Sequence, residues 1–231
     1  MALPKIDTPS YQLELPSNQQ VVKYRPFLVK EQKILMMAQE ADSQEDTYNM
    51  LSEIVDGCTF NSVDIKTMPL FDFEYLFLKI RCKSVGETAE LSILCPDDNE
   101  TRVPVKVNLD EIDVQIQDDH SNVVGVNDSI KIIMRYPTVN DIKNISQTTD
   151  NIVKLIRVCI HEVHDGDDMH SMIDVTNTEL DEFINSLPTE VFDKMGIFFS
   201  TMPRLTHVVE VKNPKTDVTS EVVIQGMESF F

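Results

Sequence analysis

The spacing of apolar residues changes between a helical period and an alternating period along the chain, and this change limits the possible folds most strongly. Helical spacing occurs at Leu28–Asp42, at Ser43–Gly57 behind a Ser43 capping box, and from Pro69 to before Gly86. Alternation then begins at Glu90 and continues to Leu109 across a polar turn, which predicts a β-hairpin.

The same change of period is repeated in the second half of the chain. A short strand at Val114 and Ile116, a turn at His120–Gly125 and a β-branched run at Ile130–Tyr136 complete a predicted central sheet. Helical spacing returns from Thr138 and includes an apolar helix at Ile152–Cys159, which we expect the acidic stretch at Asp165 to end. Two further helices at Thr178–Leu187 and Pro188–Thr201 and a hairpin at His207–Gln225 follow.

These elements predict an α+β fold with N-terminal helices, a central small antiparallel β-sheet, further helices and a C-terminal β-hairpin. We expect an extended N-terminal arm at 1–17, a mostly helical part at 18–86, an antiparallel β part at 87–137 and a helical part with the hairpin at 138–231. One compact unit and two closely packed subdomains both fit this order. The two hairpins share a strand, knuckle and strand layout, but no repeat has a constant period.

Charge and composition exclude several classes of function. The 39 acidic and 20 basic residues give a net charge of −19, which repels nucleic-acid backbones and anionic membranes. Apolar runs such as Leu76–Ile80 are far shorter than the ~20 residues of a membrane span. The N-terminus has no secretory signal pattern, so we expect folding in a cytoplasm, with Cys58, Cys82, Cys95 and Cys159 as free thiols.

One cluster of metal-ligating residue types occurs between His161 and His170, with His164 and several carboxylates inside it. Its spacing is HEVH rather than HExxH, and Gly166 interrupts a helix, so we interpret it as an acidic surface loop, with a metal-dependent hydrolase as a distant alternative. At the first knuckle, Cys95 lacks the second cysteine of a zinc knuckle. Phosphate-binding glycine loops and nucleophile motifs are missing, so we expect no enzyme, cofactor, metal or small-molecule substrate.

Aromatic and arginine residues supply the candidate partner-binding sites, because both types are enriched at protein interfaces. Arginine lies in an apolar setting in Tyr-Arg-Pro-Phe and in Met-Arg-Tyr-Pro, although an internally paired arginine explains both patterns equally well. The two terminal aromatics either fold back, which we favour, or enter a partner. The candidates are Tyr24, Arg25, Phe27, Arg135, Tyr136, Phe230 and Phe231.

Four segments in this order resemble the baseplate hub proteins of T4-like contractile-tailed phages. They are Tyr24-Arg-Pro-Phe-Leu-Val-Lys-Glu-Gln-Lys, Phe77-Leu-Lys-Ile-Arg-Cys-Lys-Ser-Val-Gly, Arg135-Tyr-Pro-Thr and the terminal Ser-Phe-Phe. The resemblance extends over nearly the whole chain and involves no catalytic motif. Some similar proteins carry paired cysteines at the two hairpin knuckles, whereas this chain has Cys95-Pro-Asp-Asp and Asn213-Pro-Lys-Thr.

The resemblance implies a non-enzymatic hub assembly protein that binds other baseplate hub or tail proteins in the cytoplasm of the infected bacterium. The alternative that it leaves open is a permanent structural subunit of the hub in the virion tail.

Overall fold

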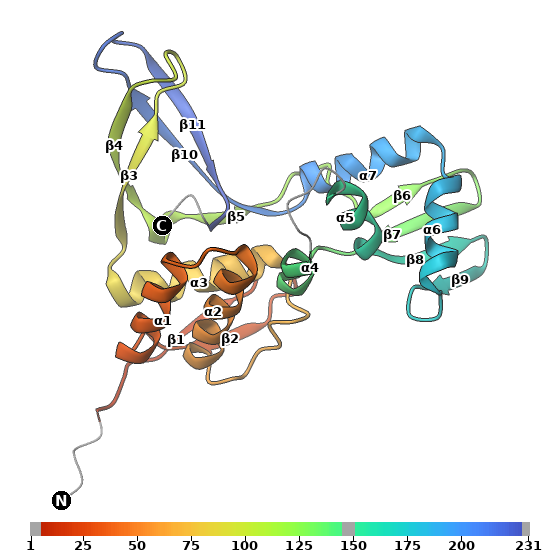
Figure 1. Ribbon diagram of the computed structural model, residues 1–231, viewed down its shortest axis with the longest axis horizontal. Helices are drawn as coiled ribbons and strands as arrows, with labels where there is room; N and C mark the ends of the chain where they lie inside the picture. The colour runs from red at the N-terminus through yellow and green to blue at the C-terminus, as the bar shows by residue number, and fades with distance from the viewer. Residues whose placement is uncertain (1–5, 145–150, 228–231) are drawn as a thin grey trace, which may run out of the picture. The chain divides into compact units, whose positions relative to one another are not determined.

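The computed structural model describes residues 6–144 and 151–227, with the side chains of 143, 144 and 151 excepted. The chain forms two compact units (Figure 1): unit 1 comprises Met1–Gln115 and Arg204–Phe231, and unit 2 comprises Ile116–Pro203. The division cuts across the expected segments 87–137 and 138–231. Both units combine helices with small antiparallel sheets, which confirms the predicted α+β class.

The helices of unit 1 lie where the apolar spacing predicts them. They are α1 (Val29–Gln39), α2 (Gln44–Cys58) and α3 (Leu70–Val85). The Ser43 side chain caps α2 by accepting a hydrogen bond from the Asp46 N–H. Gly57, expected to end α2, lies inside it. A Cβ atom at this position would lie 3.1 Å from Glu31 Oε1, so glycine allows the close approach of α1.

The predicted N-terminal arm also contains a strand. Here β1 (Tyr11–Glu14) pairs antiparallel with β2 (Val21–Tyr24), with Tyr11 opposite Tyr24. Leu15 is buried just beyond β1, and the Ser17 N–H and hydroxyl both donate to the Asp72 carboxylate on α3. The arm prediction is therefore wrong for this stretch, because three prolines hid a strand of only four residues.

Two hairpins of unit 1 pack face to face. β3 (Thr88–Leu94) pairs with β4 (Arg102–Asn108), and β10 (Arg204–Lys212) pairs with β11 (Thr219–Gln225). After the short 3₁₀ helix η1 (Leu109–Glu111), β5 (Asp113–Gln115) pairs with β10. Apolar side chains from both hairpins form one buried cluster with α3 residues Leu78 and Cys82. In Figure 1 the two hairpins run side by side away from the helices of this unit.

Unit 2 contains a four-stranded antiparallel sheet in the order β6-β7-β8-β9. Its strands are β6 (Val123–Gly125), β7 (Ile130–Met134), β8 (Ile160–Asp165) and β9 (Asp168–Ser171). The predicted turn at His120–Gly125 therefore contains β6, and the predicted acidic loop at 161–170 is the β8–β9 hairpin. The expected single central sheet is also corrected, because β3–β4, β5 and β6–β7 belong to three different sheets.

Helices α4 (Val139–Asn144), α5 (Asn151–Cys159), α6 (Asn177–Ser186) and α7 (Thr189–Thr201) complete unit 2. The Thr176 side chain caps α6, and Glu179 completes the capping box. Buried residues of α5 and α7, among them Ile156, Met195 and Phe198, pack in one cluster with Ile132 of β7. This cluster is separate from the hairpin core of unit 1.

Candidate partner-binding surface

Arg25 joins the end of β2 to α1 and α2. Its backbone N–H donates to the Cys58 carbonyl at 3.0 Å, and its guanidinium donates to Glu31 Oε1 and the Gly57 carbonyl, both at 2.8 Å. The Glu31 carboxylate also accepts the Leu28 N–H at 2.8 Å. We call this group, Arg25, Glu31 and Cys58, the first arginine clasp. The Arg25 guanidinium is therefore paired inside unit 1, as the alternative of an internally paired arginine predicts.

Unit 2 contains a second clasp with the same plan, made of Arg135, Asp141 and Cys159. The Arg135 N–H donates to the Cys159 carbonyl at 2.7 Å, and its guanidinium donates to both Asp141 oxygens, at 2.7 and 3.1 Å. Asp141 also accepts the Thr138 N–H at 2.8 Å. In both clasps the carboxylate follows the arginine by six residues and the second helix ends at a cysteine.

Burial and hydrogen bonding determine the charge states in the clasps. Burial alone raises the pKa of Glu31, but hydrogen bonds from Arg25, the Leu28 N–H and Lys30 outweigh it and lower the pKa to about 2. The pKa of Asp141 is likewise lowered, because bonds from Arg135 and Thr138 outweigh burial. Burial raises the pKa of the Cys58 and Cys159 thiols to about 12. Both thiols therefore stay protonated and poorly nucleophilic.

The aromatic candidates differ in exposure. Tyr24 is buried with its ring 5.6 Å from that of Tyr11, whereas Phe27 is half-buried against Phe77. In unit 2, the Tyr136 hydroxyl lies 3.0 Å from His120 Nε2, and the two rings stack. Phe230 and Phe231 lie outside the described residues. Of the described aromatic candidates, Phe27 and Tyr136 retain side-chain surface for a partner.

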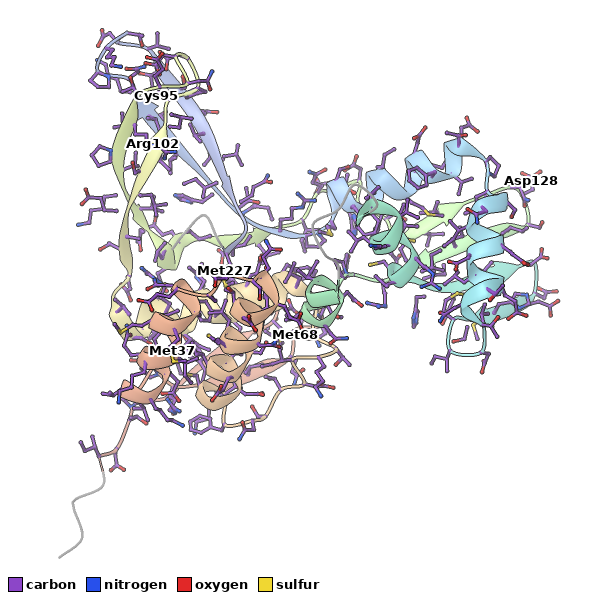
Figure 2. All side chains as sticks on the ribbon, viewed as in Figure 1. Met37, Met68, Cys95, Arg102, Asp128 and Met227 are labelled. Atoms are coloured by element: carbon purple, nitrogen blue, oxygen red, sulfur yellow. The ribbon has the colours of Figure 1, made fainter. Side chains whose placement is uncertain are left out.

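Helix α1 carries an exposed apolar face that the sequence analysis did not identify. Val29 is 74% exposed, Met36 57% and Met37 58%, and Leu28 is exposed at the start of the helix. Met37 is labelled on this helix in Figure 2. The spacing of seven and eight residues from Val29 to the two methionines places them on one side of the helix, opposite buried Leu35 and Ala38. That spacing was the available signal, because exposed apolar side chains at such positions mark interaction surfaces.

The histidine-rich hairpin of unit 2 does not assemble a set of ligands. On β8, where the register with β7 shifts, His161 Nε2 lies 3.5 Å from Glu162 Oε1, so His161 and His164 both face the Glu162 carboxylate. His164 Nε2 lies 2.9 Å from Glu162 Oε2, and Gly166 takes a positive φ of 58° in the turn. Within 6–144 and 151–227, no group of three or more His, Cys, Asp or Glu side chains is arranged to hold a metal ion.

The two hairpin knuckles of unit 1 contact one another through Asp97. Asn213 Nδ2 donates to both Asp97 oxygens, at 3.1 and 3.0 Å, and the Thr216 hydroxyl donates to Oδ2. These bonds lower the pKa of Asp97. Cys95 is buried beneath the first knuckle near the far end of the hairpins in Figure 2. Some similar proteins carry paired cysteines at these two knuckles. In this chain, side-chain hydrogen bonds connect the knuckles instead.

The knuckles also share their backbone geometry. In the first, the Cys95 N–H donates to the Thr101 carbonyl and the Asn99 N–H to the Cys95 carbonyl; in the second, the Asn213 N–H donates to Val218 and the Asp217 N–H to Asn213. Asn99 and Asp217 both take a positive φ, at 53° and 61°. A strand, an arginine clasp, two helices, a helix that begins after a proline (Pro69 or Pro188) and a hairpin thus occur twice in this order. In the second copy, β8, β9 and α6 are inserted before the helix that follows Pro188.

The described helices include none that is both long and apolar enough to cross a membrane. Comparison with known proteins gives one family model, described as T4 bacteriophage base plate protein, which matches residues 8–231. No curated protein and no solved structure is similar enough to count as a match. Because the family model extends over all but the first seven residues, the chain belongs to the T4 bacteriophage base plate protein family.

Proposed function

We propose that this base plate protein is a non-enzymatic hub assembly protein that binds other hub components while the base plate is built. Membership of the base plate family supports a structural or assembly role. The hub role rests on the resemblance of the Tyr24, Phe77 and Arg135 segments to hub proteins. The observation that carries a binding role is the exposed apolar face of α1.

The first arginine clasp holds this face in place. Arg25 bonds Glu31 on α1 and the Gly57 carbonyl on α2, so the two helices are tied together at the end where α1 begins. Phe27, half-buried between β2 and α1, extends the apolar surface next to Leu28 and Val29. We therefore assign Arg25 as a positioning residue and Phe27, Val29, Met36 and Met37 as contact residues. Methionine side chains adapt to varied partner surfaces.

Charge limits the kind of partner. Unit 1 contains 24 acidic and 14 basic residues, and unit 2 contains 15 acidic and 6 basic residues. A partner with a basic surface matches the negative net charge of both units, because complementary charge speeds association and repels acidic competitors. We expect association to slow as salt is raised, since screening shortens the range of this attraction.

The proposal assigns no nucleophilic role to the buried cysteines. The pKa values of Cys58 and Cys159 are about 12, so neither thiol supplies a thiolate near neutral pH. Cys82 is also buried, and burial raises its pKa as well. The function that we propose for the chain is recognition, with the proteins of the base plate as partners.

Capture of base plate proteins from infected cells tests the role of α1. We expect the double substitution Val29→Asp and Met36→Asp to reduce capture at least about tenfold, because the charges would face an apolar site. The matched control is Val223→Asp, since Val223 is 54% exposed on β11 of the same unit. Circular dichroism checks that all variants fold. Equal capture by the α1 variant and wild type removes α1 from the interface.

Analysis of purified virions separates a transient assembly role from a permanent one. A transient factor is expected in infected-cell extracts bound to hub proteins and in trace amounts in virions. Gel and mass-spectrometric quantification against other base plate proteins measures this ratio. Stoichiometric amounts in virions would replace the assembly role with that of a permanent hub subunit.

A further inference from the structure

Helix α6 of unit 2 covers its sheet loosely. Its apolar residues Leu180, Phe183 and Ile184 pack against the core of unit 2, yet each is only half-buried, and no residue of the helix is buried. Helix α7 contributes to the same core and buries four residues. Because closely packed interiors leave few voids, an apolar helix face that stays half-buried indicates unfilled space beneath it.

That space is a pocket of about 240 Å³ between α6 and the neighbouring strands (Figure 1). A dry apolar cavity of about 150 Å³ holds a benzene ring, so this pocket has room for one side chain of the size of phenylalanine. Its apolar lining comes from three elements and a loop: Leu180 and Phe183 of α6, Ile130 of β7, Val163 of β8, and Met172 and Val175 between β9 and α6.

The opening of the pocket is negatively charged. Its two polar lining residues, Asp165 of β8 and His170 of β9, are both exposed. Asp165 lies directly opposite Asp168 on β9, and Asp167 is in the turn between them. No lysine or arginine with a described side chain forms an ion pair with these three carboxylates. Like charges opposite one another on paired strands are destabilising, so a positive group from outside the chain is favoured here.

We propose that this pocket is a second docking site, which receives a phenylalanine-sized apolar side chain flanked by lysine or arginine from a segment of another base plate protein. The apolar side chain fills the space under α6, and its basic neighbours pair with Asp165 and Asp168. Ile173, which follows Met172 of the wall, is 91% exposed and extends the apolar contact outside the pocket. The partner class rests on the proposed function, whereas the site shares no residue with the α1 face.

Binding of a blocked peptide, Lys-Lys-Phe-Lys-Lys, to the full-length protein tests this site. We expect saturable NMR shift changes at Val163, Met172 and Val175, because the phenylalanine ring would lie against them. Replacing the phenylalanine of the peptide by alanine, or its lysines by glutamate, should weaken binding at least about fivefold. Equal binding of the three peptides, or shift changes that spare the pocket, overturn the proposal. Shift changes at these residues on concentrating the protein without peptide would identify a second copy of the chain as the occupant and overturn it as well.

Substitutions in the pocket separate specific binding from general attraction to an acidic protein. Val175→Phe fills the pocket from its own wall and should lower peptide affinity at least about tenfold, whereas Val153→Phe, at an exposed position of α5, should not. Asp165→Asn should weaken binding severalfold, and its control, Asp193→Asn on α7, removes the same charge outside the lining. Circular dichroism checks that the variants fold. Wild-type affinity in both pocket variants overturns the proposal.

The α1 variant with Val29→Asp and Met36→Asp distinguishes failure of this site from failure of the proposed function. It should bind the lysine-flanked peptide at least as tightly as wild type, because no α1 residue lines the pocket. Capture of base plate proteins from infected cells by Val175→Phe then measures use of the site by natural partners. We expect this variant to lose at least one partner that Val153→Phe retains. Unchanged capture overturns the assignment of a base plate partner to the pocket, whatever the result for α1.

Discussion

At the scale of single residues, Glu31 shows why an arginine in an apolar sequence is an ambiguous signal. Its side chain is 2% exposed, and an ionised carboxylate with so little water requires a charged partner and further donors. Arg25, the Leu28 N–H and Lys30 provide them. The sequence placed Arg25 among aromatics, which is equally typical of an interface and of a buried pair. Glu31, six residues after Arg25, decides between the interface and the buried pair, because it forms the ion pair with Arg25.

The pKa of Glu31 predicts how its contribution to stability changes with pH. Its folded-state pKa of about 2 lies below its ordinary value of 4.5, so the stabilisation is present above 4.5 and is lost as pH falls through about 2. A shift of this size corresponds to about 3 kcal/mol. We expect Glu31→Gln to remove this part of the acid dependence, measured by urea unfolding between pH 6 and pH 2.

The exposed Glu53 on α2 provides the matched control, because Glu53→Gln also removes one negative charge. The measured quantity is the difference in unfolding free energy between each variant and wild type at every pH. That difference should shrink toward pH 2 for Glu31→Gln. A difference that is constant with pH contradicts the assignment of an ionised, stabilising Glu31.

At the scale of elements, the sequence predicted most helices and both long hairpins, because their apolar periods extend over seven residues or more. It missed β1, β6, β8 and β9, which have three to six residues each. β8 follows α5 directly after Cys159 with no breaker between them, so only pairing with β7 and β9 defines it as a strand. Long-range pairing of this kind has no local signal.

The contact between the two hairpin knuckles leads to a prediction at this scale. Asp97→Ala removes the acceptor for Asn213 and Thr216, so the β10–β11 tip loses its side-chain tie to the β3–β4 tip. We expect the Asp217 amide of that tip to exchange its hydrogen several times faster. In the variant, the tip opens without first breaking the hydrogen bonds to Asp97. Amide exchange measured by NMR gives the rates.

Glu100→Ala tests whether any lost carboxylate at the tips has this effect. Glu100 lies in the first knuckle with an exposed side chain, and its nearest basic group is Lys215 Nζ at 4.0 Å. We expect wild-type exchange at Asp217 in this variant. Equal acceleration by both substitutions would mean that tip charge, not the Asp97 contact, controls opening.

At the scale of the whole molecule, the chain leaves unit 1 after Gln115 and re-enters it at Arg204. Each expected segment was continuous in sequence, so none of them could combine residues up to Gln115 with residues from Arg204 onward in one unit. The repeated plan was visible only as two similar hairpins, because the clasps share an arginine, a carboxylate and a cysteine within otherwise different segments. Their equivalence lies in backbone contacts, Arg25 N–H to Cys58 and Arg135 N–H to Cys159, which a sequence does not display. The exposed face of α1 had a signal in its spacing but was not predicted, because spacing groups apolar residues on one side of a helix without showing whether another element covers them.

Substitution of the two clasp arginines tests whether the units are separate in stability as well as in structure. We expect Arg25→Met to speed amide exchange in α1 and at the end of α2 but not in unit 2, since the buried Glu31 would keep only Lys30 and the Leu28 N–H as partners, at a cost of about 3 kcal/mol. Arg135→Met should act only on unit 2, and less strongly, because the Arg135 and Asp141 side chains are more exposed than Arg25 and Glu31.

Arg102→Met is the control for losing an arginine, because Arg102 is exposed on β4 (Figure 2) and its guanidinium donates to the Ser92 carbonyl of the neighbouring strand. It should leave exchange in both clasps unchanged. If either clasp substitution accelerates exchange equally in both units, the molecule opens as one cooperative body. The binding face of α1 would then depend on unit 2 as much as on its own clasp.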